Sequence, residues 1–291
     1  MSYKEHFVPR GRHRIYAREY EGEEPTIVLM HGFPDNLHLY DHLVPRLSPP
    51  RRVVTFDFLG WGASDKPSDY PYTADNQTWD LDAVIDHLKL GSVMLVAHDA
   101  SGPPAIDWAL GHPDRIAALV LLNTYYNPMP TLRAPEAILL FSTPVVRNVA
   151  RFVSGRFDLF RRFYWWQVGK RFIRDEEVRD VFVPLLYEQF ATVPSAKPAF
   201  FSLNADLRTT LRSRAGVTDR MNTFERPVRI IFGEDDPYLN GGVARRFHEL
   251  FPTSDLFLLP GARHFPQLDE PEKVAHLILS APLDVKSPVR I

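Results

Sequence analysis

Short apolar runs rich in β-branched residues recur along the chain, with turn residues between them. The runs are continuously apolar, so we expect each one to be buried on both faces, as strands of a parallel sheet are. Two short strands before Thr26 would make Ile116–Leu122 the sixth strand. The predicted strands are Thr26–Met30, Arg52–Phe56, Ser92–Ala97, Ile116–Leu122, Val228–Phe232 and Asp255–Leu259.

Apolar residues recur at helical spacing between these runs, which predicts an α/β fold. From about Tyr125 to Phe224 the alternation stops, and the sequence is helical, aromatic-rich and arginine-rich without a clear strand. We interpret residues 125–224 as a helical lid, or cap, inserted after the sixth strand into a core made of 1–124 and 225–291. Such a lid would cover the carboxyl end of the sheet, where doubly wound sheets place their sites. The predicted core helices are Leu37–Leu47, Thr78–Leu88, Pro103–Leu110, Gly242–Leu250 and Pro271–Leu279.

Composition narrows the class of protein. The chain has 291 residues, 45% of them hydrophobic and 24% charged, with a formal net charge of -2. This balance favours neither a nucleic-acid partner nor a strongly acidic one. There is no cysteine, which excludes disulfides and thiolate chemistry. No signal-peptide region and no apolar stretch of about 20 residues is present, so we expect a cytoplasmic protein that does not enter a membrane.

The most specific chemical signal is an aspartate at a sharp turn. Residues 97–101 read Ala-His-Asp-Ala-Ser directly after an apolar strand, and Gly102 opens the next helical segment. Small residues flank Asp99 because a strained strand-to-helix turn leaves no room for larger ones. A carboxylate held there can attack a saturated carbon and form an alkyl ester that water then hydrolyses. Ser101 lies two residues past the apex, so serine-esterase chemistry fits poorly.

Three further motifs each follow a predicted strand. His31-Gly32-Phe33-Pro34 can aim the Phe33 N–H at a developing anion, with the Ala100 N–H as second donor. Residues 233–237, Gly-Glu-Asp-Asp-Pro, offer an acid, and the spacing favours Asp236 over Asp235. Residues 261–265, Gly-Ala-Arg-His-Phe, offer His264. The order nucleophile, acid, histidine is that of α/β-hydrolases.

Nearly the whole chain resembles the α/β-hydrolase superfamily, in its aspartate-nucleophile branch of epoxide hydrolases and haloalkane dehalogenases. The resemblance implies an α/β-hydrolase fold, with a mostly parallel eight-stranded sheet flanked by helices. It assigns Asp99 as nucleophile, His264 as general base and Asp236 as its acid partner. It also assigns the Phe33 and Ala100 N–H groups as the oxyanion hole, and it implies no cofactor or metal. The partners would be a small apolar electrophilic substrate and water.

The leaving group distinguishes the two activities. Haloalkane dehalogenases usually carry side-chain N–H donors after the nucleophile and after His-Gly, where this chain has Ala100 and Phe33. A lid tryptophan, Trp165 or Trp166, could supply one donor, and residues 61–67 (Trp-Gly-Ala-Ser-Asp-Lys-Pro) resemble the dehalogenase loop. Epoxide hydrolases usually carry two lid tyrosines, and the His-Gly-Phe-Pro motif resembles their form. The candidate phenols are Tyr125, Tyr126, Tyr164 and Tyr187.

We therefore favour an epoxide hydrolase that forms vicinal diols, with haloalkane dehalogenase as the alternative. A non-catalytic small-ligand receptor on the same fold is a third hypothesis. Arginines interleaved with aromatics over residues 151–174 resemble a nucleic-acid or membrane surface, but an amphipathic lid helix is the better interpretation. His38 and His42 lack a third ligand nearby, so we expect no metal site. The sequence does not predict the oligomeric state.

Overall fold

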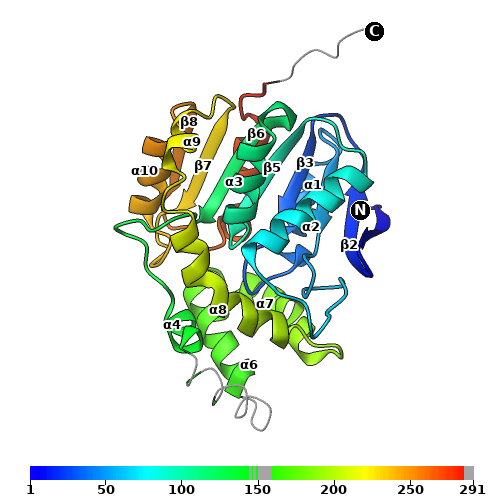
Figure 1. The fold of residues 1–291 in the computed structure, drawn as a ribbon, viewed down its shortest axis with the longest axis vertical. Coiled ribbons are helices and arrows are strands. Elements are labelled where there is room, and N and C mark those ends of the chain that lie inside the picture. Colours follow the sequence, from blue (N-terminus) through cyan, green and yellow to red (C-terminus); the bar gives the residue numbers. More distant parts are fainter. Residues whose placement is uncertain (144–145, 147–148, 150–158, 285–291) are drawn as a thin grey trace.

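A single eight-stranded sheet organises the chain (Figure 1). The computed structural model describes residues 1–143, 146, 149 and 159–284. The strand order is β1-β2-β4-β3-β5-β6-β7-β8, with β2 antiparallel to both β1 and β4 and every other pair parallel. This confirms the predicted mostly parallel sheet of the α/β-hydrolase fold. The strands are β1 (Lys4–Arg10), β2 (His13–Tyr20), β3 (Thr26–Met30), β4 (Val53–Phe56), β5 (Val93–Asp99), β6 (Ile116–Thr124), β7 (Val228–Gly233) and β8 (Ser254–Leu259).

Burial explains why the strands were visible as continuous apolar runs. Every residue of β3, β4, β5, β6 and β7 is buried, because helices cover both faces of the sheet. Two strands run further than predicted. β5 continues to Asp99 and β6 to Thr124, and these two residues pair with each other across a register shift. The polar ends of both strands carry side chains of the candidate site.

The helices of the core lie largely where the pattern placed them, with one correction. The predicted helix Leu37–Leu47 is two short pieces, η1 (Leu37–Tyr40) and α1 (Val44–Leu47). The break has a local cause, because Pro45 lies in the first turn of the second piece and has no N–H to donate to the turn before it. The other core elements are α2 (Ala74–His87), α3 (Gly102–Gly111), η2 (Pro113–Arg115), α10 (Gly241–Leu250), α11 (Pro266–Asp269) and α12 (Pro271–Leu279).

Between β6 and β7 the described residues are helical and include no strand, as the pattern predicted. In Figure 1, α4, α6, α7 and α8 gather at one end of the sheet. The last helix of the segment, α9, instead contacts α10. The elements are α4 (Glu136–Ser142), α6 (Leu159–Tyr164), the π-helix η3 (Trp165–Phe172), α7 (Glu176–Ala191), α8 (Lys197–Ser213) and α9 (Thr218–Asn222).

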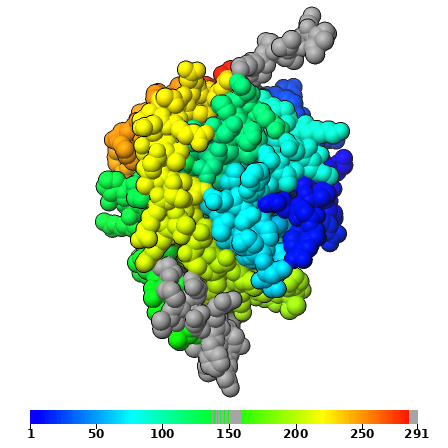
Figure 2. Space-filling model, in the orientation of Figure 1, coloured from blue at the N-terminus to red at the C-terminus, as the bar shows by residue number. Residues whose placement is uncertain are grey.

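The lid helix α8 is tied to the core by ionic and polar contacts. Arg214, which caps α8 and is 5% exposed, donates to the carboxylates of Asp107 and Asp75. In the middle of the helix, Asp206 accepts the Ala74 N–H at the start of α2. Figure 2 shows the result, with the yellow-green atoms of this region lying directly against the cyan atoms of the core. The lid and the core helices therefore form one continuous surface on this face.

Candidate active site

Asp99 stands at a strained turn between β5 and α3. Its φ is +49°, a left-handed conformation that costs free energy for any residue except glycine. The crowding around it explains two glycines in the motifs. A Cβ on Gly32 would lie 2.7 Å from the Asp99 Cβ, and one on Gly102 would lie 1.9 Å from Thr124 Oγ1. The strain holds the Asp99 carboxyl group above the carboxyl end of the sheet.

Two backbone N–H groups bind the Asp99 carboxylate. Phe33 N lies 2.9 Å from Asp99 Oδ2 and donates to it, and the Ala100 N–H also donates to this carboxylate. These are the two donors that the sequence predicted for an oxyanion hole. Burial raises the pKa of Asp99, while the charge of His264 and the two N–H groups oppose that rise. The backbone thus holds the Asp99 carboxylate, which also lines the pocket.

His264 and Asp236 form a buried pair. His264 Nδ1 lies 2.7 Å from Asp236 Oδ2, which leaves Nε2 of His264 for the pocket. Asp235 is exposed, so of the two candidate acids only Asp236 contacts the histidine. Burial would lower the pKa of His264, but the charge and hydrogen bond of Asp236, with the charges of Asp99 and Asp35, raise it to about 9.

The Asp236 carboxylate is itself held from several sides. The N–H groups of Tyr238 and Leu239 donate to Oδ1 at 2.8 and 3.1 Å. Asn123 Nδ2 donates to Oδ2 at 3.1 Å from the end of β6. Burial acts to raise the pKa of Asp236, but the charge and hydrogen bond of His264 and the two N–H groups lower it overall. Asp236 therefore stays ionised and can stabilise an imidazolium at His264.

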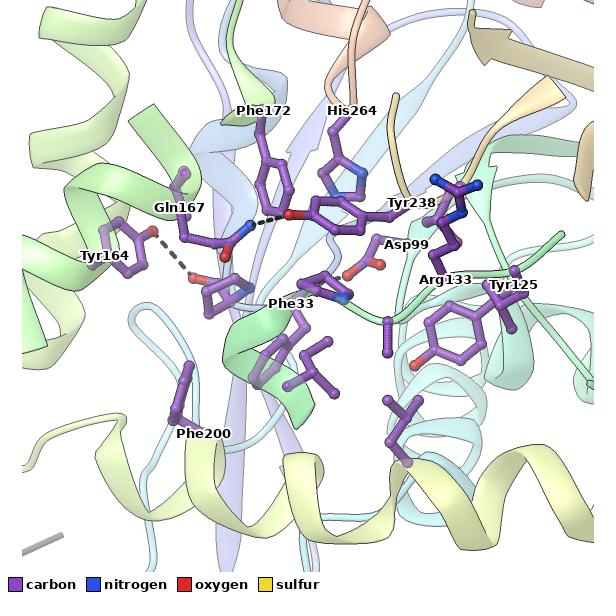
Figure 3. Close-up of a pocket in the computed structure, with 18 of the residues that line it drawn as sticks. Phe33, Asp99, Tyr125, Arg133, Tyr164, Gln167, Phe172, Phe200, Tyr238 and His264 are labelled. Carbon is purple, nitrogen blue, oxygen red and sulfur yellow. Dashed lines mark hydrogen bonds between the residues drawn. The ribbon is translucent and has the colours of Figure 1, made fainter. Parts of the chain in front are cut away.

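An apolar cavity opens over Asp99 and His264 (Figure 3). Besides Asp99 and His264, the polar side chains of its wall are three phenols, one amide and the guanidinium of Arg133. Residues of the wall include Ile138, Phe160, Phe163, Phe172, Phe200 and Leu207.

Two of the predicted phenols line this cavity. Tyr125 directly follows β6, and no hydrogen bond from its hydroxyl occurs within the described residues. Burial and the nearby Asp99 charge raise the pKa of Tyr125, so its phenol is protonated at neutral pH. Tyr164 is 2% exposed, and its hydroxyl donates to the Pro34 carbonyl oxygen at 3.3 Å. Figure 3 shows the two rings on opposite sides of the Asp99 carboxylate.

The remaining lid candidates do not line the cavity. Trp165 and Trp166 line a separate surface hollow, and Trp166 is 41% exposed. Tyr187 packs against the ring of Tyr164, and Tyr126 donates to Asp107 Oδ1. These positions correct the prediction that Trp165 or Trp166 supplies an N–H in the pocket, because neither side chain lines it. The physical reason is the π-helix η3, whose turn directs Gln167 and Val168 inward instead.

Several residues of the site were not singled out from the sequence. Gln167 is 5% exposed and lines the cavity, with Nε2 donating to the Tyr238 hydroxyl at 3.3 Å and Oε1 without a partner among the described residues. Asp35, one residue beyond the His-Gly-Phe-Pro motif, is fully buried. The position of Asp35 beside that motif could have drawn attention to it, whereas no motif in the sequence points to Gln167.

Gln189 of α7 connects the lid to the turn that carries Phe33. Its Nε2 contacts the carbonyl oxygens of Pro34 and Asp35, both at 3.2 Å, and its Oε1 accepts the Gly62 N–H at 2.8 Å. The side chain is 3% exposed. The lid therefore fixes the backbone that aims the Phe33 N–H at Asp99.

The described residues contain no group of three or more side chains arranged to hold a metal ion. They also contain no helix with the length and apolar character needed to span a bilayer.

Known proteins resemble the chain over most of its length. Haloalkane dehalogenase 2 of Mycobacterium tuberculosis (strain ATCC 25618 / H37Rv) is 27% identical over 278 residues, which is 92% of this chain and 91% of that protein. Cis-3-alkyl-4-alkyloxetan-2-one decarboxylase of Shewanella oneidensis is 35% identical over 164 residues, covering 53% of this chain and 51% of that one.

The crystal structure of the haloalkane dehalogenase DatA from Agrobacterium tumefaciens C58 superposes with a TM-score of 0.81 at 23% identity, covering 96% of this chain and 95% of that one. The sequence profile of the alpha/beta hydrolase fold matches residues 25–271. The predicted superfamily is thereby confirmed, and the chain belongs to the alpha/beta hydrolase fold family.

Proposed function

We propose that this hydrolase opens epoxides through an ester of Asp99 and releases vicinal diols. The observation that carries the proposal is the set of groups facing the Asp99 carboxylate. Three phenols line the cavity with it, of which Tyr238 already donates to Glu136, whereas Ala100 and Phe33 have no side-chain donor and both lid tryptophans lie elsewhere. An epoxide oxygen needs a proton as the ring opens, and a protonated phenol is a suitable acid.

Asp99 acts first as nucleophile. The carboxylate oxygen not held by Phe33 attacks an epoxide carbon, the carbon–oxygen bond breaks, and its electron pair goes to the ring oxygen. Tyr125 protonates that oxygen, because its hydroxyl has no protein acceptor among the described residues and lies on the Asp99 side of the cavity. The product is a hydroxyalkyl ester of Asp99, and Tyr125 is left as a phenolate.

His264 then drives hydrolysis of the ester. Neutral Nε2 takes a proton from a water molecule, whose oxygen attacks the ester carbon of Asp99. Negative charge develops on the oxygen that already accepts from the Phe33 N–H, and the Ala100 N–H also donates to this carboxylate, so the donors are in place before the transition state. When the intermediate collapses, the two protons of the water end on the departing diol oxygen and on Tyr125, and the Asp99 carboxylate is restored.

A haloalkane dehalogenase is the second candidate. The name of the relative from M. tuberculosis and the amide of Gln167 support it, since that amide places side-chain N–H groups of the lid in the wall of the cavity. The relative from S. oneidensis is named for a strained four-membered oxygen ring, so an oxetan-2-one belongs among the substrates tested.

Trapping the ester distinguishes these activities. His264→Ala removes the base and should stall the reaction at Asp99, and the adduct is read from the intact mass after incubation with epoxides, haloalkanes or an oxetan-2-one. A mass gain of a whole epoxide supports the proposal, and a gain of an alkyl group without halogen supports dehalogenation. The double variant Asp99→Asn/His264→Ala is the matched control and should gain no mass. No adduct from any substrate would contradict catalysis and favour the receptor hypothesis.

A further inference from the structure

Asp35 is a buried carboxyl group that the reaction above does not use. Its side chain has no exposed surface, and neither oxygen has a hydrogen-bond partner among the described residues. Burial without a hydrogen-bond partner strongly disfavours the ionised form of a carboxyl group. The titratable groups that face it are His98, Asp99, His264, Tyr40 and Tyr164.

His98 has a defined tautomer. Its Nε2 lies 2.8 Å from the backbone carbonyl oxygen of His264, and a carbonyl oxygen only accepts, so Nε2 carries the proton. The ring is fully buried, and burial, with the charge of His264, holds the pKa of His98 well below its usual range. In the neutral ring Nδ1 therefore presents a lone pair. That atom has no other partner in the described part of the chain and lies 3.9 Å from Asp35 Oδ2.

The separation is informative when it is compared with the other buried histidine–aspartate pair. His264 and Asp236, which attract each other as ions, are 2.7 Å apart, whereas His98 and Asp35 are 3.9 Å apart. Burial and the Asp99 charge also raise the pKa of Asp35 to about 8. A neutral carboxyl group offers an O–H toward the lone pair of His98, while an ionised one would repel it.

We propose that Asp35 is a positioning residue that must stay protonated: its O–H faces the lone pair of His98 across 3.9 Å and attracts it without a direct hydrogen bond, His98 holds the backbone of His264, and ionisation of Asp35 sets the alkaline limit of the enzyme. The inference rests on the proposed function, because ester hydrolysis by His264 is the step that it limits. An ionised Asp35 adds a second negative charge beside Asp99 and raises the pKa of His264. The ionised group also repels the lone pair of His98. His264 is therefore less often neutral, and it is less well placed to act as the base.

Spectroscopy tests the protonation states without any turnover. In wild-type protein at pH 7, ¹⁵N NMR should show His98 with one protonated nitrogen and one bare nitrogen. Infrared spectroscopy should show a protonated carboxyl band that Asp35→Asn removes and that titrates near pH 8. A doubly protonated His98 beside an ionised Asp35 would overturn the inference. Both measurements stand even if no substrate is turned over, so they separate this inference from the proposed activity.

Kinetics test the role. Asp35→Asn keeps an N–H donor for His98 but cannot ionise, so we expect at most about a threefold loss of ester hydrolysis at pH 7 and an alkaline limb that moves above pH 9. Asp35→Ala has no donor and should lose tenfold or more. The exposed Asp235→Asn is the control and should keep the wild-type pH profile. Equal losses in the Asn and Ala variants, or an unchanged alkaline limb in Asp35→Asn, would refute the role.

Discussion

Forming the ester should itself convert His264 into a base. In the resting protein the pKa of His264 is raised to about 9 against the effect of burial, by Asp236 first and then by Asp99, and Asp35 adds to this rise when it is ionised. At pH 7 a group with that pKa is neutral in only about 1% of molecules. Esterification neutralises Asp99 and leaves Asp236 in place. The negative charge of Asp99, which favours the protonated imidazole, therefore disappears at the moment when hydrolysis needs a neutral imidazole.

Asp99→Asn imitates the uncharged ester and allows the effect to be measured. A nearby opposite charge raises a histidine pKa by about 1–3 units. Because Asp99 contributes less here than Asp236, we expect a fall of about one unit, from about 9 toward 8. One unit corresponds to about 1.4 kcal/mol and to about ten times more neutral imidazole at pH 7.

NMR titration of the His264 ring gives the result directly, with the signal assigned by its loss in His264→Ala. Asp235→Asn, which removes an exposed carboxylate from the same motif, should leave the titration where it is. Asp236→Asn should lower the pKa of His264 further than Asp99→Asn does, because it removes a hydrogen bond as well as a charge. A pKa that stays at about 9 in Asp99→Asn would refute this account of the switch.

Three other outcomes are expected. Tyr125→Phe should slow the epoxide-opening half-reaction about 100-fold in single-turnover mass spectrometry, whereas Tyr187→Phe should not slow it, and equal effects would exclude Tyr125 as the acid. Gln189→Leu should lower the free energy of unfolding by about 1–3 kcal/mol in urea denaturation, because it leaves buried backbone groups unpaired, and no loss would contradict the lid contact. Between pH 6.5 and 9 the raised pKa of His264 means that the folded state binds more protons, so stability falls by about 3 kcal/mol as the imidazole loses its charge. Calorimetry should show a smaller decline in Asp236→Asn, and a decline of the same size would contradict the pairing.

The sheet was predictable because its strands are buried on both faces, which leaves a continuous apolar signature such as Thr26–Met30. The positions around Asp99 were predictable for a different reason. Each one lies in the turn that follows a strand, and parallel strands bring their carboxyl ends together. These positions are Phe33, Ala100, Asp236 and His264. The residues of the lid helices neither form strands buried on both faces nor follow directly after a strand. Whether a tryptophan or Gln167 faces the cavity depends on the π-helix η3, and one extra residue per turn rotates every later side chain. Asp35 escaped notice since a lone aspartate after a proline usually marks only a turn.

The contact made by Gln189 limits how freely such a lid could be exchanged. Lids are attractive units for engineering, because a chain that enters and leaves the sheet between β6 and β7 could in principle be replaced whole to change the pocket. Here the replacement would also remove the side chain that holds the carbonyl groups of Pro34 and Asp35. A chimaera that kept the sheet and all of Asp99, His264 and Asp236 would still lose alignment of the Phe33 donor. A transplanted lid must therefore carry an equivalent amide at the position of Gln189 if the Phe33 N–H is to stay directed at Asp99.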